Sequence, residues 1–200
     1  MTPYPFQPPT PGRKEVVASP GKLWKRVPQE QRAEAVRAFW EDEDGVEQQA
    51  EALLAIASRL RFRPKTVRSL PLEKKVRYLV SMPALSDSIA SRVLVSYHLR
   101  HQRPMLGAFL DALGIEHDNG VLAAESITKP DQAKLREAAA KLRAEFPPDA
   151  VELYFQTLLA QDAETWGDLV ELLDGEQPAE AATAAAGEPS PEEPEGGPTA

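Results

Sequence analysis

The chain has 200 residues and no cysteine, and its 31 acidic residues outnumber its 23 basic residues, giving a formal net charge of −8. The acidic balance argues against a globally basic protein. The lack of cysteine excludes disulfides, thiol nucleophiles and cysteine-ligated metals. Apolar runs are too short to span a bilayer, so we expect a cytoplasmic protein that does not contact membranes.

The length suits one domain with tails, because both ends of the chain are poor in large apolar residues. We expect a disordered proline-rich leader over 1–21 and a single helical domain over 22–175. A disordered tail of Ala, Glu and Pro is expected over 176–200.

Helical spacing of apolar residues runs through the middle of the chain, and no segment alternates like a strand for long. The sequence therefore predicts an all-α protein of seven or eight helices stacked as antiparallel hairpins. The helices expected in chain order cover about 28–40, 46–60, 71–80, 86–101, 104–113, 128–146, 148–159 and 162–173. In the second of these helices, the stripe expected to face the core is Val46, Ala50, Leu53, Leu54, Ala57 and Leu60.

The segment 86–120 is expected to organise the rest of the fold. Ser86 or Ser88 can cap a helix whose apolar residues cover several faces, and Pro104 starts the next helix, which Gly114 closes. The following polar loop contains Asn119-Gly120, a pair that adopts positive φ readily. We expect this loop to lie at the far end of the helical hairpin from His101.

Two stretches of sequence resemble each other at an offset of 43 residues. Val27-Pro28 aligns with Leu70-Pro71, and an Arg-Pro pair follows the second helix of each stretch. A two-helix repeat of this length falls in the range of HEAT and armadillo solenoids. Irregular helical packing is the alternative, because proline followed by an acidic residue begins many unrelated helices.

The basic residues are concentrated in the middle of the chain. Eleven of them lie between Arg59 and Arg103, opposed only by Glu73 and Asp87. Repeat stacking would bring the corners Arg63-Pro64 and Arg103-Pro104 side by side. The candidate partner-binding surface comprises Arg59, Arg61, Arg63, Lys65, Arg68, Arg92, Arg100 and Arg103.

Three interpretations of this basic surface are open. The acidic helices after Thr128 and the tail could neutralise it internally, an acidic protein partner could bind it, or nucleic acid could bind it. Aromatic residues suited to stacking on bases are missing from the cluster apart from Phe62. The oligomeric state is left open.

Two smaller groups of residues are also candidates. His98 and His101 lie three residues apart on one expected helix and could bind a metal together with a third ligand. The loop of Glu116, His117, Asp118 and Asn119 could form a small ligand-binding or interface site, or serve as a plain turn.

No hydrolase elbow, phosphate loop, dinucleotide motif or zincin motif is present, and we expect neither a catalytic residue nor a cofactor. The leading hypothesis is a non-enzymatic interaction or scaffold module that binds an anionic partner through the basic surface. The alternatives are a nucleic-acid-binding protein and a metal-dependent enzyme that uses His98 and His101.

Overall fold

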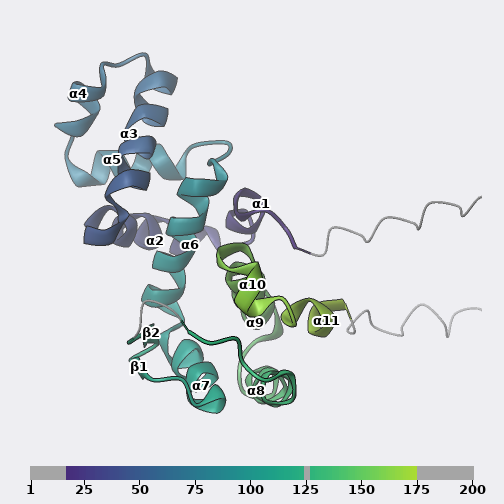
Figure 1. Ribbon diagram of the computed structural model, residues 1–200. Coiled ribbons are helices and arrows are strands. Elements are labelled where there is room, and N and C mark those ends of the chain that lie inside the picture. Colours follow the sequence, from purple (N-terminus) through teal and green to yellow (C-terminus); the bar gives the residue numbers. More distant parts are fainter. Residues whose placement is uncertain (1–16, 124–126, 175–200) are drawn as a thin grey trace, which may run out of the picture.

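The computed structural model describes residues 17–123 and 127–174, and this part of the chain is mostly helical, as predicted (Figure 1). The expected leader up to residue 16 and the tail from residue 175 lie outside the described residues. Within the described ranges, no helix is both long and apolar enough to cross a membrane. The elements are α1 (Pro20–Trp24), α2 (Gln29–Glu41), η1 (Glu43–Gly45), α3 (Val46–Leu60), α4 (Pro64–Arg68), α5 (Leu72–Val80), α6 (Asp87–His101), α7 (Arg103–Leu113), β1 (His117–Asp118), β2 (Val121–Leu122), α8 (Gln132–Glu145), α9 (Pro148–Gln161), α10 (Ala163–Trp166) and α11 (Leu169–Asp174).

Helix α6 links the two halves of the molecule. It packs against α1, α2 and α3 on one side and against α7 and α9 on the other (Figure 1). The Ser86 hydroxyl accepts a hydrogen bond from the backbone N–H of Ile89, so Ser86 is the N-cap among the two predicted candidates, Ser86 and Ser88. Side chains on several faces of α6 are buried, including Val93, Leu94 and Tyr97. The segment therefore organises the fold as its composition predicted.

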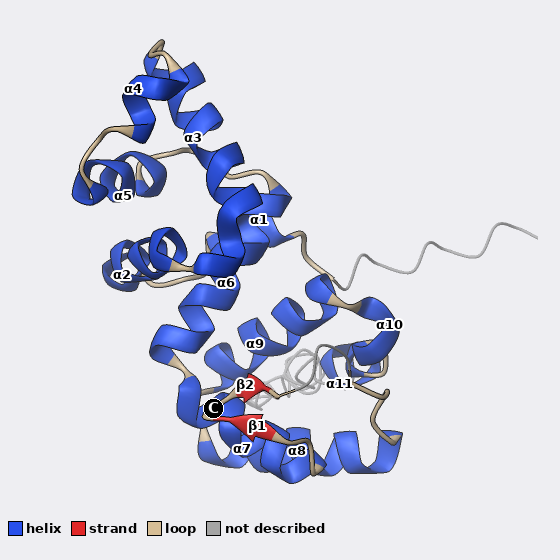
Figure 2. Ribbon diagram, turned by 60° about the vertical axis from the view of Figure 1, so that its left-hand side comes forward, coloured by secondary structure: helices blue, strands red, loops and turns tan. Residues whose placement is uncertain are grey.

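The buried side chains form two hydrophobic clusters. One is built mainly from α1 to α6 and includes Phe39 and Ile56, and the other is built from α7 to α11 and includes Phe109 and Phe155. Figure 2 shows the first group around the upper part of α6 and the second group beside and below its lower part. Complete burial of such a side chain stabilises the fold by about 1.5–3 kcal/mol.

The core-facing stripe of α3 differs from the prediction. Ala52, Ile56 and Ala57 are buried there, whereas Val46 and Leu54 are exposed. Apolar residues occur on two faces of this helix, and the packing of α4, α5 and α6 decides which face is covered.

Two short helices were not predicted, and one predicted helix is divided in two. The expected connector 61–70 contains the short helix α4, and the expected leader ends in α1; each of these helices has proline in its first turn. The last expected helix is divided at Gly167 into α10 and α11.

The loop after α7 is a small β-hairpin, which the sequence analysis did not predict. His117 pairs with Leu122 and Asp118 with Val121. Asn119 and Gly120 adopt φ of 50° and 85°, which confirms the positive φ predicted for this pair and is typical of a two-residue hairpin turn.

This hairpin folds back along α7 and does not extend away from it. A Cβ built on Gly120 would lie 2.9 Å from the Leu106 Cβ and 3.2 Å from the Arg103 carbonyl oxygen, both in the first turns of α7. The prediction that the loop lies at the far end from His101 was therefore wrong.

Candidate functional site

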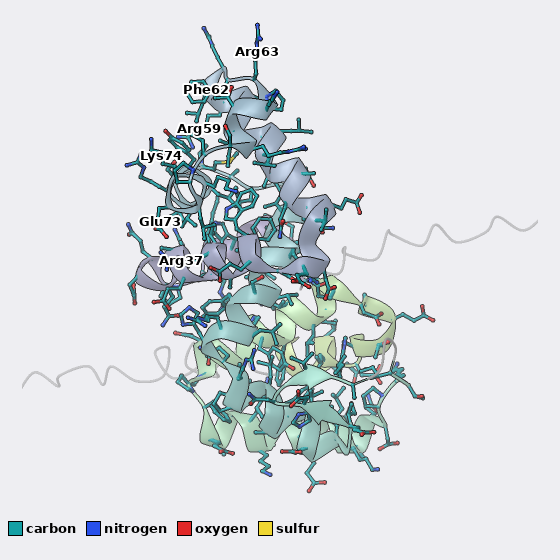
Figure 3. All side chains as sticks on the ribbon, turned by 90° about the vertical axis from the view of Figure 1, so that its left-hand side faces the viewer. Arg37, Arg59, Phe62, Arg63, Glu73 and Lys74 are labelled. Carbon is teal, nitrogen blue, oxygen red and sulfur yellow. The ribbon has the colours of Figure 1, made fainter. Side chains whose placement is uncertain are left out.

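One end of the molecule, formed by the C-terminal turn of α3 together with α4 and α5, carries a high density of basic side chains. Figure 3 shows Arg59, Phe62 and Arg63 at this end, with Lys74 further along the same face. We call this region the basic end. It comprises Arg59, Arg61, Arg63, Lys65, Arg68, Lys74, Lys75 and Arg77.

The backbone of the basic end is fixed locally. Arg61 caps α3 in the left-handed conformation, with φ of 53°, and Phe62 N–H donates to the Ala57 carbonyl oxygen at 2.9 Å. Pro64 then starts α4, whose Val67 is fully buried. This buried side chain holds α4 against α3, so the charged residues on either side of it project outward.

A side-chain bond joins the end of α3 to the end of α5. The Arg59 guanidinium donates from Nη1 to the Ser81 carbonyl oxygen at 2.7 Å. This contact satisfies a backbone acceptor at a helix C-terminus, where a cation is also favoured by the helix dipole. Arg59 is therefore a structural clamp as well as a surface charge.

Most other cations of the basic end are free to meet a partner. Two of them contact aromatic rings, Lys75 with Trp40 at 5.3 Å and Arg77 with Tyr78 at 5.5 Å from ring centroid. The remaining five are exposed, and none has an ion pair or side-chain hydrogen bond within the described part of the chain. These five are Arg61, Arg63, Lys65, Arg68 and Lys74.

The only acidic residue between Arg59 and Ser86 is Glu73, which is paired with an arginine from another helix. Arg37 on α2 donates to both carboxylate oxygens of Glu73 at 3.0–3.2 Å. The hydrogen bonds that Arg37 donates to Glu73, and then the negative charge of Glu73, raise the pKa of Arg37. Because the Glu73 charge is compensated, it does not neutralise the other cations.

A groove of about 650 Å³ lies between α2 and α5, next to the basic end. Ala33, Val76 and Val80 contribute apolar surface to it, and Lys74 and Arg77 line it with positive charge. Figure 3 shows Arg37, Glu73 and Lys74 along this face. This groove cannot be read from the sequence, because its two walls come from segments more than 30 residues apart.

The remaining predicted basic residues lie elsewhere. Arg92 is partly buried, and its Nε lies 2.6 Å from Asp42 Oδ2. Arg103 donates from Nε to the Leu99 carbonyl oxygen at 2.7 Å, and Arg100 is exposed near the end of α6. Figures 1 and 2 both show α4 and α7 at opposite ends of the molecule. The two Arg-Pro corners are therefore not side by side.

Helices α8 to α11, which are acidic only when taken together, do not cover the basic end. Both views show them around α7 and the lower half of α6, away from α4 (Figures 1 and 2). Ion pairs in this region include Arg136 with Glu171, Lys129 with Asp168, and Glu152 with Arg26, which follows α1. Among the described residues, these helices therefore do not neutralise the basic end. The acidic tail over 176–200, the other candidate for internal neutralisation, lies outside the described residues.

The histidines occupy three different environments. His98 Nε2 lies 3.1 Å from the Thr157 hydroxyl, and His101 Nε2 lies 3.7 Å from a Glu34 carboxylate oxygen. His117 lies against Asp111, at 3.1 Å. Among residues 17–123 and 127–174, no three His, Asp or Glu side chains are placed to hold a metal ion together.

The candidate loop around His117 is held as a turn. Gly120 N–H donates to His117 Nδ1 at 3.1 Å, so His117 Nε2 carries the hydrogen that is donated to Asp111. Glu116, Asp118 and Asn119 are exposed. These contacts assign His117 a role in fixing the hairpin against α7.

Comparison with models of protein families, with curated proteins and with solved structures finds no significant match.

Proposed function

We propose that this protein is a non-enzymatic interaction module that binds an acidic protein partner through its basic end. The observation that carries the proposal is the set of five exposed, unpartnered cations on a fixed corner of the helical body, Arg61, Arg63, Lys65, Arg68 and Lys74. Exposed like charges held close together repel one another, and an anionic partner relieves that repulsion. The site is therefore built for a ligand that brings several negative charges at once.

The fixed backbone of the basic end supports this proposal. Arg59 joins α3 to α5, and Val67 anchors α4 against α3. A surface whose backbone is already ordered loses less conformational entropy when it binds. Binding then requires only that the long basic side chains adjust to the partner.

The groove between α2 and α5 favours a protein over a nucleic acid as the partner. It offers apolar surface from Val76 and Val80 beside the charges of Lys74 and Arg77. An acidic segment with apolar side chains would use both features, whereas a phosphate backbone would use only the charge. Phe62 is the large exposed aromatic side chain of this end, and it is 45% exposed.

We also propose that α1–α3 and α4–α6 are two copies of a helical repeat. Helices α1 and α4 each have five residues and begin at proline, and α3 and α6 each have 15 residues. The contacts support this pairing because α1 packs on α6 while α4 packs on α3. Superposition of the two halves in an experimental structure tests the idea: a shared backbone path is expected, and divergent interhelical angles would contradict it.

Binding of a fluorescein-labelled acidic peptide of Glu, Leu and Ala tests the main proposal. Two charge-reversed variants are compared by fluorescence anisotropy at moderate salt. One is Arg61→Glu/Arg63→Glu at the basic end, and the control is Lys134→Glu/Lys141→Glu on α8. Both change the net charge equally, and all four side chains are exposed.

The proposal predicts that reversal at the basic end weakens peptide binding at least tenfold and that the control changes it less than threefold, because exposed charges act mainly within a Debye length of about 10 Å. Equal weakening by both variants would show a response to net charge alone, and no weakening would refute the proposal. Tighter binding of a labelled oligothymidylate than of the peptide would replace the acidic protein by single-stranded nucleic acid.

A further inference from the structure

One face of α3 carries a row of exposed side chains spaced four residues apart, which we call the α3 row. It comprises Val46, Ala50, Leu54 and Ser58. Val46 and Leu54 are 66% and 57% exposed, more than any other large apolar side chain that the structure describes. Helical periodicity places Ala52 and Ile56, two buried residues of α3, on the opposite side of the helix. The α3 row is therefore a partly apolar surface that faces solvent.

The two ends of this face carry opposite charges. Glu47 is exposed in the first turn of α3, and Arg61 is exposed directly after the last residue of the helix. Neither side chain has an ion pair or hydrogen bond within the described part of the chain, whereas Glu51 accepts from the Ser86 hydroxyl at 2.6 Å. The α3 row therefore runs from an acidic first turn to the basic end.

Such a face is complementary to itself when two copies of α3 pack antiparallel about a two-fold axis. In a two-fold contact, residue i of one copy meets residue j of the other, and j meets i. An axis at Leu54 sets this side chain against its own copy and Ala50 against Ser58. The same register sets Glu47 against Arg61 twice. Rows of side chains spaced four apart form the ridges of the commonest class of helix pairs, so the α3 row suits such a contact.

We propose that the α3 row binds a second copy of the same chain and forms an antiparallel, two-fold symmetric dimer. The charges select this occupant, because a second copy brings a base to Glu47 and an acid to Arg61, whereas a purely acidic segment would be repelled by Glu47. The contact uses one helix of 15 residues. Because this area is below that of a standard interface, the dissociation constant should be on the order of tens of micromolar.

Self-association goes beyond the acidic partner proposed above and does not depend on it. Arg61 belongs to both surfaces, whereas the other cations of the basic end lie outside the α3 row. Sedimentation equilibrium measures the dimer directly and needs no acidic peptide. A failure of either proposal is therefore distinguishable from a failure of the other.

Sedimentation equilibrium of the full chain, from low micromolar to submillimolar concentration, tests the dimer. The wild type should shift from monomer to dimer as the concentration rises. Leu54→Glu should weaken association at least tenfold, because it removes an apolar contact and brings two carboxylates together at the axis. The matched control is Val121→Glu, at an exposed apolar position on β2, and it should change association less than threefold. A monomer at every concentration, or equal effects of the two variants, would overturn the proposal.

Charge exchange tests which residues face each other. Glu47→Arg and Arg61→Glu should each weaken self-association at least threefold, because each brings like charges together. Fluorescein-labelled Glu47→Arg should nevertheless bind unlabelled Arg61→Glu at least threefold more tightly than it binds itself, since every facing pair in the mixed dimer is then of opposite charge.

Lys134→Glu on α8 changes the net charge as Arg61→Glu does and is the control partner for the labelled variant. The labelled protein should bind it at least threefold more weakly than it binds Arg61→Glu. Equal binding of the two partners would show a response to net charge alone and would overturn the antiparallel register.

Discussion

Arg37 on α2 holds the carboxylate of Glu73 on α5 through hydrogen bonds of 3.0–3.2 Å. This pair crosses the groove beside the basic end. Glu73 is the only acidic residue between Arg59 and Ser86, and Arg37 compensates its charge. The positive potential of the basic end therefore depends on a residue from a different helix.

Substitutions in this pair should change binding of the acidic peptide in opposite directions. Arg37→Gln exposes the negative charge of Glu73 to the peptide and should weaken binding about two- to fivefold at low salt. Glu73→Gln frees the Arg37 guanidinium and should strengthen binding by a similar factor. Fluorescence anisotropy measures both. Identical affinities for the two variants would show that the pair does not affect the site.

His98 should make the stability of the protein sensitive to acid. Its pKa is about 3 in the folded protein and near 6.5 when unfolded, so the unfolded state binds the extra proton between these pH values. Stability therefore falls as the pH drops below 6.5, by about 2 kcal/mol between pH 7 and pH 5. Urea denaturation at the two pH values measures this loss.

The His98→Gln variant is the control for that titration, since Gln does not titrate and still offers a donor to Thr157. Its loss of stability between pH 7 and pH 5 should be about 2 kcal/mol smaller than that of the wild type. An equal loss in both proteins would assign the acid sensitivity to other groups.

Asp42 and Arg92 tie the end of α2 to the first half of α6 in a partly buried ion pair, with 2.6 Å between Arg92 Nε and Asp42 Oδ2. Asp42 also accepts from Asp44 N–H and so caps η1. A double-mutant cycle with Asp42→Asn and Arg92→Met should give a coupling energy of about 1 kcal/mol in urea denaturation. Additive effects of the two substitutions would indicate that the pair contributes no net coupling.

The glycine of the hairpin turn should tolerate alanine less well than the glycine that caps α7. Gly120 has φ of 85°, and an added Cβ would lie 2.9 Å from the Leu106 Cβ, whereas Gly114 has φ of 71° and open space around it. Gly114→Ala should cost about 1–2 kcal/mol, the usual penalty of the left-handed conformation. Gly120→Ala should cost more, since the contact adds to that penalty. Thermal denaturation of both variants measures the difference.

The sequence predicted those features that depend on local chemistry. The N-cap at Ser86, the Gly114 terminus of α7 and the positive φ of Asn119 follow from capping and turn preferences. Helix α4 was missed because a five-residue helix has too little periodicity to detect, and its stability comes from burial of Val67.

The features that depend on distant packing could not be predicted. The stripe of α3 is an example: Leu54 and Ile56 are both apolar, and only the arrangement of α4, α5 and α6 buries one and exposes the other. Likewise, the pairing of Arg37 with Glu73 joins residues 36 positions apart. The basic residues formed one group in sequence, yet α7, which begins at Arg103, lies at the opposite end of the molecule from α4, which follows Arg63, and α6 runs between them (Figure 2).

Lysine footprinting tests the central claim most directly. The protein is acetylated briefly with acetic anhydride, with and without saturating acidic peptide, and the modification of each lysine is measured by mass spectrometry. The account predicts that the peptide protects Lys65 and Lys74 severalfold and leaves Lys134 and Lys141 unchanged. Protection of the α8 lysines without protection of Lys65 and Lys74 would contradict it.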